Sequence, residues 1–194
     1  MTRSGVSAIV LAGGRSSRFG RDKLAEPIDG RALLLHAIDA VQAFATEVLV
    51  VVAPGARPYV PPGVRIIADA RPFEGPLAGL LTGLGTANEP MVLVTGGDMP
   101  ELVGGVLEAL LIPFDQPGTE ATVLEQAGRA RPLPMVLRRE VALDAAASLV
   151  ANGERRLRAL VDALATIVIA ENAWRALDPG GRSVFDVDTQ ADLR

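Results

Sequence analysis

The chain has no cysteine, a single histidine (His36) and a single lysine (Lys23) among its 194 residues. Without cysteine the protein cannot form disulfide bonds, thiolate metal sites or a cysteine nucleophile. One histidine makes histidine-rich metal sites and serine–histidine relays poor candidates as well. The chemistry of this protein must therefore come from carboxylates, arginine, lysine and backbone groups.

Aromatic residues are also scarce, at 4% of the chain, whereas hydrophobic residues make up 49%. The core must therefore consist mainly of Ala, Val, Leu and Ile, a profile typical of an α/β domain, and the length suits one domain. No apolar run is long enough to span a membrane, and the apolar run within 1–11 is too short for a signal peptide. We expect a cytoplasmic protein that does not contact a membrane.

Positive charge is limited, since the formal net charge is −4. Nucleic-acid-binding proteins usually carry a broad basic face, so this balance argues against a nucleic-acid partner. Of the 19 Lys and Arg residues only Lys23 is a lysine, which indicates compositional pressure against lysine. A lysine that persists under such pressure is a candidate for chemistry that arginine cannot perform.

Apolar runs alternate with glycine- and proline-rich loops and predict alternating strands and helices. In the first half the order is strand, helix, strand, strand, helix, strand, helix. By the right-handed crossover rule this order gives an α/β fold with a doubly wound, mostly parallel sheet flanked by helices, and the second half predicts a small antiparallel elaboration. Strands are expected at 6–11, 47–53, 64–68, 91–95, 121–126, 132–137, 166–170 and 184–188. Helices are expected at 31–44, 76–87, 102–111, 140–152 and 156–164, with a short helical segment at the C-terminus.

Two unusual loops, 12–22 and 96–100, follow strands at their carboxyl ends, where such sheets bind ligands. The first loop is rich in glycine and arginine and leads to Lys23. Its paired glycines allow backbone N–H groups to approach phosphate oxygens, and its basic side chains supply compensating charge. It has neither the ending of a P-loop nor the spacing of a dinucleotide fingerprint. The loop therefore predicts a triphosphate cradle, the alternative being a solvated basic turn.

The second loop contains Asp98 after two glycines. A carboxylate on a glycine-rich loop at the end of a strand can hold Mg²⁺ together with waters and triphosphate oxygens. Asp98 is therefore a candidate magnesium ligand, although aspartate is also favoured as a turn or N-cap residue. Asp69 follows the strand expected at 64–68 and is either a nucleotide ligand or the cap of the next turn. His36 lies within an expected helix and is interpreted as structural.

Loop 11–23 resembles the opening of nucleotidylyltransferases of the molybdenum-cofactor guanylyltransferase type, which has the form Leu-Ala-Gly-Gly…Arg-[Met/Phe]-Gly…Asp-Lys. This opening alone marks a wider superfamily that includes sugar-phosphate and cytidylyl enzymes. Five later motifs extend the resemblance over essentially the full length and favour molybdopterin as the acceptor. They are Asp69 after a strand, Gly-Pro-Leu-Ala-Gly at 75–79, Asp98 before Met-Pro, Gly-Glu-Arg-Arg at 153–156 and Asp-Val-Asp-Thr at 186–189.

The resemblance implies a Rossmann-like nucleotidyltransferase fold and a Mg²⁺-dependent transfer of GMP from GTP to the terminal phosphate of molybdopterin, with release of pyrophosphate. We expect a single nucleotidyltransferase domain, 1–194, in which 1–112 is the NTP-binding half and 113–194 the acceptor-side half. GTP and molybdopterin are the implied small-molecule substrates, and contact with other molybdenum-cofactor proteins would be transient.

The resemblance and the chemistry of the loops together give a set of expected site residues. Nucleotide contacts are expected at Leu11, Ala12, Gly13, Gly14, Arg15, Lys23, Asp69, Gly75 and Asp98. Catalytic roles are expected for Lys23, Arg18 and Asp98, with Asp98 as the metal ligand. The lysine ammonium would follow the α-phosphate as charge shifts toward pyrophosphate. Acceptor contacts are expected at Arg155, Arg156, Asp186 and Asp188, the alternative for the two arginines being ordinary surface charge.

The chain departs from the family pattern at two places. Gly97 replaces the usual Cys or Ala, and Asp186 and Asp188 replace the usual Asn residues. Two more carboxylates beside phosphates need a nearby cation, for which Arg155 and Arg156 are the available candidates. Related enzymes that use CTP or a sugar phosphate, and a non-catalytic nucleotide-binding domain, are open alternatives. A Rossmann oxidoreductase is disfavoured because the first loop is too long, too basic and wrongly spaced.

Overall fold

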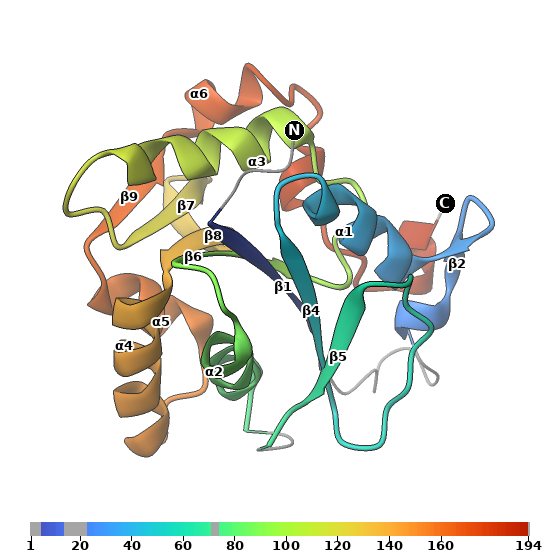
Figure 1. Ribbon diagram of the computed structural model, residues 1–194. Helices are drawn as coiled ribbons and strands as arrows, with labels where there is room; N and C mark the ends of the chain where they lie inside the picture. Colours follow the sequence, from blue (N-terminus) through green and yellow to red (C-terminus); the bar gives the residue numbers. More distant parts are fainter. Residues whose placement is uncertain (1–4, 14–22, 71–73, 194) are drawn as a thin grey trace.

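The computed structural model describes residues 5–13, 23–70 and 74–193 of the chain. Its main strands are β1 (Val6–Ala12), β4 (Glu47–Val52), β5 (Val64–Ala68), β6 (Met91–Gly96), β7 (Ala121–Gln126), β8 (Arg129–Arg138) and β9 (Thr166–Ile169). Within the described residues these seven strands form one sheet in the order β5-β4-β1-β6-β8-β7-β9 (Figure 1). The strands β5, β4, β1 and β6 run parallel, β8 is antiparallel to β6 and β7, and β9 is parallel to β7. The predicted doubly wound sheet with an antiparallel elaboration in the second half is confirmed.

The central strands are apolar along their length because helices cover both faces of the sheet. Along β1, Val6, Ala8 and Val10 contribute to one layer of the core, whereas Ile9 contributes to the other. This division follows from strand geometry, in which successive side chains point to opposite faces. Burial of each such Val or Ile side chain contributes about 1.5–3 kcal/mol. A shift of β1 by one residue would exchange its two layers, so the pattern fixes the register of this central strand.

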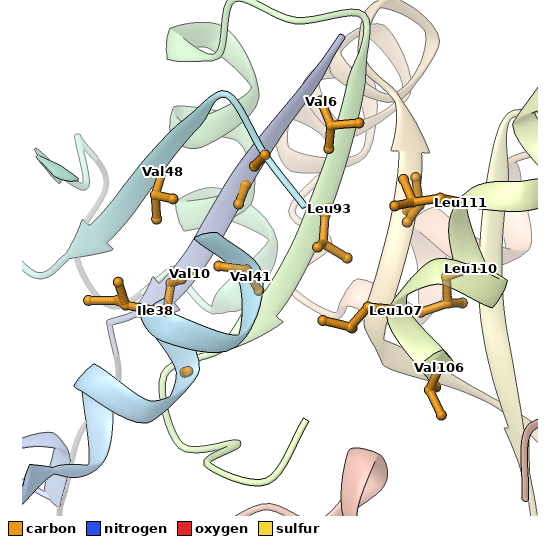
Figure 2. Close-up of a cluster of buried hydrophobic side chains, with 14 of the residues drawn as sticks. Val6, Val10, Ile38, Val41, Val48, Leu93, Val106, Leu107, Leu110 and Leu111 are labelled. Atoms are coloured by element: carbon orange, nitrogen blue, oxygen red, sulfur yellow. The ribbon is translucent and has the colours of Figure 1, made fainter. Parts of the chain in front are cut away.

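One face of the sheet is covered by three helices. They are α1 (Leu33–Gln42), α3 (Gly104–Leu111) and α6 (Glu171–Arg175). Figure 2 shows Ile38 of α1 and Leu107 of α3 in the same layer as Val10 and Leu93 of the sheet. This layer of the core runs along β1 from Val6 to Val10, near the carboxyl end from which the first loop leaves.

The opposite face is covered by a second set of helices (Figure 1). They are α2 (Pro76–Thr86), α4 (Arg139–Ala151) and α5 (Leu157–Ala163). These helices enclose a separate apolar cluster with the other side chains of the same strands. None of the helices among the residues described above has the length and apolar character of a membrane span.

A small hairpin precedes α1 and corrects one sequence-based prediction. It consists of β2 (Pro27–Ile28) and β3 (Arg31–Ala32), which pair antiparallel. The helix predicted at 31–44 therefore begins two residues later than expected, at the first residue of α1. The reason is the turn at Asp29 and Gly30, whose φ angles of 49° and 76° are typical of a two-residue hairpin loop. His36 Nε2 lies 3.0 Å from the carbonyl oxygen of Ile28, which ties this hairpin to α1 and supports a structural role for the histidine.

The end of the chain also differs from its prediction. Two short 3-10 helices, η3 (Arg182–Val184) and η4 (Gln190–Leu193), flank residues 185–189, which are called the tail below. The strand predicted at 184–188 is wrong, because the tail has no strand structure. The alternation of apolar and polar residues on which that prediction rests correctly indicates which residue is buried, since Val187 is 0% exposed and packs with Leu33. However, the Val187 N–H donates to the carbonyl oxygen of Asp98 (2.9 Å) and not to a neighbouring strand.

Candidate active site

The carboxyl ends of β1 and β6 lie side by side, because the two strands are neighbours in the sheet. Strand β1 ends at Ala12 and leads through Gly13 toward the predicted cradle. Strand β6 leads into the loop that carries Asp98, and within this loop the Gly97 N–H donates to the carbonyl oxygen of Leu11 at 2.9 Å. The start of the first loop, at Ala12 and Gly13, and the loop that carries Asp98 therefore lie at the edge of the sheet where doubly wound folds bind their ligands.

Lys23 and Asp98 come from distant parts of the sequence and form an ion pair at this edge. Lys23 Nζ lies 2.9 Å from Asp98 Oδ2, and the two side chains are 15% and 31% exposed. The ammonium also donates to the carbonyl oxygen of Val187 in the tail, and it lies 4.0 Å from Asp188 Oδ1. Oxygens from two segments thus hold the end of a side chain whose four-carbon stem is flexible. A cation positioned in this way can stabilise charge that develops on a phosphate.

Glycine at position 96 makes room for the Asp98 carboxylate. A Cβ atom at Gly96 would lie 2.4 Å from Asp98 Oδ1, which is closer than real Cβ atoms approach other heavy atoms. The carboxylate therefore folds back over a backbone that has no side chain, while its other oxygen receives the hydrogen bond from Lys23. Only glycine at this position permits the observed orientation of the predicted metal ligand.

Gly97 does not leave the loop loose, although it replaces the family's usual Cys or Ala. A Cβ atom at Gly97 would lie 3.1 Å from Leu34 Cδ1 and 3.4 Å from the carbonyl oxygen of Leu11, so the residue already packs closely against its surroundings. The loop is also anchored by hydrogen bonds to β1 and to the tail, which the Gly97 N–H and the Asp98 carbonyl oxygen make. A small side chain at 97 would require these neighbours to shift by a few tenths of an ångström.

The donor atoms around Lys23 suit a hard divalent cation. Asp98 and Asp188 flank the ammonium with carboxylate oxygens, the ligand type that Mg²⁺ prefers. In the described part of the chain no group of three or more His, Cys, Asp or Glu side chains could hold a metal by itself. A magnesium ion here would keep waters and take oxygens from its substrate, as it does in sites with one or two carboxylates. The residues present therefore fit a magnesium ion that is bound together with a nucleotide.

Asp192, which sequence reasoning misses, organises the end of the tail. Its Oδ2 accepts hydrogen bonds from the Thr189 N–H (2.7 Å), the Thr189 hydroxyl (2.9 Å) and the Asp188 N–H (3.1 Å). These bonds, those from Thr189 first, and the nearby Lys23 lower the pKa of the Asp192 carboxyl below its usual value. The spacing of Thr189 and Asp192 is that of a capping motif, which is a signal that could have identified this residue.

Asp186 is neutralised by Arg131, a residue that sequence reasoning also misses. The distance from Arg131 Nη2 to Asp186 Oδ1 is 2.8 Å. The guanidinium also donates to Gln126 Oε1 at 2.9 Å and to the carbonyl oxygen of Leu133 at 3.1 Å. Asp188 pairs with Lys23, whose Nζ lies 4.0 Å from its Oδ1. The prediction that Arg155 or Arg156 neutralises these two carboxylates is therefore wrong.

Arg156 instead pairs within its own turn, at the N-terminus of α5. Its Nε and Nη2 atoms donate to Glu154 Oε1 and Oε2 at 3.0 and 2.8 Å. The hydrogen bonds from the Arg156 side chain, followed by those from the Arg156 and Arg155 N–H groups, lower the pKa of the Glu154 carboxyl to about 2. The Arg156 side chain is 79% exposed, so its geometry also fits the alternative of ordinary surface charge.

Arg155 packs on the N-terminus of α2 beside Gly75. A Cβ atom at Gly75 would lie 2.8 Å from Arg155 Cβ and 2.9 Å from the Arg155 carbonyl oxygen, and Gly75 has a φ of 93°. The same carbonyl oxygen accepts a hydrogen bond of 3.2 Å from the Leu77 N–H. Glycine is therefore required at position 75 for two reasons. A side chain would collide with Arg155, and the positive φ angle is unfavourable for other residues. The structure brings a predicted acceptor residue next to a predicted nucleotide residue at this point.

Asp69 lies apart from the Lys23–Asp98 pair. It follows β5, which is separated from β1 by β4 in the sheet. The Asp69 N–H donates to the carbonyl oxygen of Val52 at 2.8 Å, and Oδ1 accepts a hydrogen bond of 3.3 Å from the Thr82 hydroxyl of α2. The carboxylate thus faces α2, on the side of the sheet edge where Gly75 also lies. Three predicted site residues, Gly14, Arg15 and Arg18, lie outside the described residues.

Comparison with known proteins agrees with this arrangement. A family model described as a MobA-like NTP transferase domain matches residues 8–167. A curated relative from Chloroflexus aggregans, named probable molybdenum cofactor guanylyltransferase, is 36% identical over 97% of this chain and 92% of its own length. The molybdenum cofactor guanylyltransferase of Burkholderia vietnamiensis is 34% identical over 79% of this chain and 80% of its own length.

Solved structures share the fold at lower sequence identity. The molybdopterin-guanine dinucleotide biosynthesis protein A of Archaeoglobus fulgidus has a TM-score of 0.79 at 22% identity and covers 96% of this chain and 94% of its own. The 2-C-methyl-D-erythritol 4-phosphate cytidylyltransferase of Thermus thermophilus has a TM-score of 0.71 at 20% identity and covers 100% and 96%. The family match over most of the chain and the full-length curated relatives lead to one conclusion: this chain belongs to the MobA-like NTP transferase family and is a nucleotidyltransferase.

Proposed function

We propose that the protein transfers GMP from GTP to the terminal phosphate of molybdopterin and releases pyrophosphate. The names of the curated relatives, which match 97% of the chain, support both the nucleotide and the acceptor. The observation in the structure that carries the proposal is the ion pair of Lys23 and Asp98 at the carboxyl ends of β1 and β6. This pair supplies a positioned cation and a carboxylate for a metal at the edge of the sheet where a triphosphate would bind.

The proposed reaction is an in-line attack. A terminal phosphate oxygen of the acceptor forms a bond to the α-phosphorus of GTP, and the bond from that phosphorus to the bridging oxygen of the leaving pyrophosphate breaks. Such transfers ask the protein mainly for positioning and for stabilisation of charge. Lys23 would stabilise the negative charge that moves toward pyrophosphate, and its ammonium is already oriented by Asp98 and the tail.

Asp98 would hold Mg²⁺, with Asp188 as a second nearby carboxylate. When bound, the ion would neutralise charge on the triphosphate and orient it for attack. Arg18 would add a second cation. Lys23 would then remain close to the same phosphates, because the tail holds its ammonium independently of Asp98 through the Val187 carbonyl oxygen.

We further propose a division of labour along the chain. Residues 1–112 would bind the nucleotide, and residues 113–194 would bind the acceptor. On the nucleotide side are Leu11, Ala12, Gly13, Gly14, Arg15, Lys23, Asp69, Gly75 and Asp98. On the acceptor side are Arg155, Arg156, Asp186 and Asp188. The contact of Gly75 with Arg155 supports this division, since it joins the two groups at one end of α2. A cytoplasmic location and transient contact with other molybdenum-cofactor proteins belong to the same proposal.

A turnover assay tests the proposal. Each nucleoside triphosphate is offered with Mg²⁺ and molybdopterin, and pyrophosphate release is measured. Among the nucleoside triphosphates, only GTP is expected to give pyrophosphate release. Loss of this release when Mg²⁺ is omitted would support the proposed metal dependence. Turnover with CTP, or only with a sugar-phosphate acceptor, would replace the proposal with the corresponding alternative. Binding of GTP without turnover under any of these conditions would identify a non-catalytic nucleotide-binding domain.

A further inference from the structure

We propose that Arg131 is a positioning residue for Lys23. Through Asp186 it holds the tail in the place from which Val187 and Asp188 orient the lysine ammonium. The inference rests on the proposed function for the catalytic role of Lys23, whereas its structural part stands on the contacts of Arg131 alone. It would add to the site a residue that touches neither the lysine nor its carboxylate partner Asp98.

The backbone of β8 aims the Arg131 side chain. The pairing of β7 with β8 shifts from Val123 opposite Met135 to Leu124 opposite Arg131, so residues 132–134 are extra in β8. Such bulges bend a strand and redirect its side chains. The carbonyl oxygen of Leu133, within the bulge, accepts the hydrogen bond from Arg131 Nε, and Gln126 of β7 accepts one from Nη1. The guanidinium is therefore fixed in two directions by the hairpin before it reaches the tail.

The third direction of the guanidinium is the link to the tail. Arg131 Nη2 donates to Asp186 Oδ1 at 2.8 Å, and the Arg131 side chain is only 24% exposed. Because the tail is not part of the sheet, it has no ladder of backbone hydrogen bonds to hold it in register. The planar, three-sided fork of arginine suits a role in which one side chain must bind to a rigid hairpin and to a separate segment together.

The position of Asp186 determines the surroundings of Lys23. Val187 follows directly, and its carbonyl oxygen accepts a hydrogen bond from Lys23 Nζ while its N–H donates to the carbonyl oxygen of Asp98. Asp188 comes next, with its Oδ1 at 4.0 Å from the same ammonium. Release of the tail at Asp186 would therefore weaken both contacts that the ammonium makes with the tail, to Val187 and to Asp188. Loss of Arg131 should leave Lys23 more accessible and more variable in position.

Lys23 can be observed without any substrate, because it is the only lysine of the chain. An amine-acylating ester is added to the intact protein, and the labelling rate of the Lys23 peptide is followed by mass spectrometry with the chain's α-amino group as internal reference. Arg131→Gln should raise the labelling rate of Lys23 about tenfold, the change expected on loss of one charge-assisted hydrogen bond. Asp186→Ala should raise it similarly, whereas Asp186→Asn should not, because its amide oxygen can still accept the bond from Nη2.

Arg158 provides a matched control. Its Nε donates to Asp162 Oδ1 at 2.9 Å and its Nη1 to the carbonyl oxygen of Ala130 at 3.0 Å, so it also joins a carboxylate to the β8 backbone but has no bond to the tail. Arg158→Gln should leave Lys23 labelling unchanged. Equal labelling in Arg131→Gln and the wild type, or equal acceleration in Arg158→Gln, would overturn the proposal. If Arg131→Gln does not fold, the labelling rate of Lys23 in Asp186→Ala is compared with the rates in the wild type and in Arg158→Gln instead.

Kinetics complete the test. In Arg131→Gln the kcat for pyrophosphate release should fall about tenfold while the KM for GTP and the melting temperature change little, as expected for misplacement of a group that acts in the transition state. The double variant Arg131→Gln with Asp186→Ala should be no slower than Asp186→Ala alone, because that single variant already removes the bond between Arg131 and the tail. A fall in kcat without faster labelling of Lys23 would refute the role through the lysine. If the wild type does not turn over GTP and molybdopterin, the proposed function fails, and the labelling rates still decide the role of Arg131.

Discussion

Replacement of Gly96 by alanine separates the geometry of the site from the stability of the fold. The new Cβ would lie 2.4 Å from Asp98 Oδ1 and 3.4 Å from Met99 Cγ. The φ angle of Gly96 is not in the left-handed region, so alanine can adopt the backbone conformation. The close contact is with the end of a side chain that can rotate and not with backbone. We therefore expect Gly96→Ala to fold and to displace the Asp98 carboxylate.

The size of the displacement follows from the contact distance. Asp98 Oδ1 must move by about 0.6 Å to reach the 3.0 Å below which real Cβ contacts are essentially never found. Catalytic groups tolerate errors of roughly 0.5 Å, and a misplacement of about 1 Å can cost on the order of a hundredfold in rate. The expected result is a fall in kcat between about tenfold and a hundredfold, with a melting temperature close to that of the wild type.

The assay is pyrophosphate release for kcat, with a calorimetric melting curve for stability. Gly85→Ala is the control, because Gly85 lies within α2 and a Cβ there would meet nothing within 4 Å. That variant should keep its activity and gain up to about 1 kcal/mol of stability from better helix propensity. A wild-type kcat in Gly96→Ala would refute the placement of Asp98 in the reaction, and an unfolded Gly96→Ala would refute the reading that the side chain, and not the backbone, gives way.

Four further changes test other parts of the account. Lys23→Ala should lower kcat about a hundredfold with little effect on nucleotide binding, since about 3 kcal/mol of transition-state stabilisation depends on one preorganised charge; steady-state kinetics with near-normal kcat would remove Lys23 from the mechanism. Asp98→Asn should fold but lose the Mg²⁺-dependent rise in melting temperature with GTP, which at 100 times Kd corresponds to about 2.7 kcal/mol in the wild type; an unchanged thermal shift would exclude Asp98 as the metal ligand. Gly75→Ala should lower the melting temperature by calorimetry, because φ is 93° and the new Cβ meets the Arg155 backbone; unchanged stability would contradict that contact. The pKa of the Glu154 carboxyl is lowered from 4.5 to about 2, so its pairing stabilises the fold above pH 4.5 and this stabilisation is lost as the pH falls toward 2. Glu154→Gln should therefore show a smaller decline of melting temperature between pH 4.5 and 2 than the wild type, and an equal decline in the two proteins would refute the pairing.

Much of the sheet is predictable from local sequence. The strands expected at 64–68 and 121–126 have the observed bounds, because these short apolar runs are closed by glycine, proline or charged residues. The hairpin at 27–32 is missed although Asp-Gly between short extended segments is a strong hairpin signal. The tail is mistaken for a strand because a period of two reports which residues are buried and carries no information on where the backbone hydrogen bonds go.

The site is predictable in its location but not in its contacts. Loops at the carboxyl ends of neighbouring strands place Lys23 and Asp98 at one edge of the sheet. Their direct contact spans 75 residues of sequence, and no pattern encodes a side-chain distance over that separation. The ion pair of Arg131 and Asp186 spans 55 residues and depends on a bulge that aims the guanidinium. Choosing the correct cation for Asp186 among eighteen arginines requires the folded hairpin, because each arginine is equally suitable by charge.

The most direct test of the account follows the α-phosphate of GTP. GTP radiolabelled at the α-phosphate is incubated with the protein, Mg²⁺ and molybdopterin, and the products are separated. The account predicts that the label moves into a molybdopterin guanine dinucleotide while the released pyrophosphate stays unlabelled, and that Asp98→Asn abolishes this transfer. Transfer of label from CTP in place of GTP, or undiminished transfer in Asp98→Asn, would contradict it.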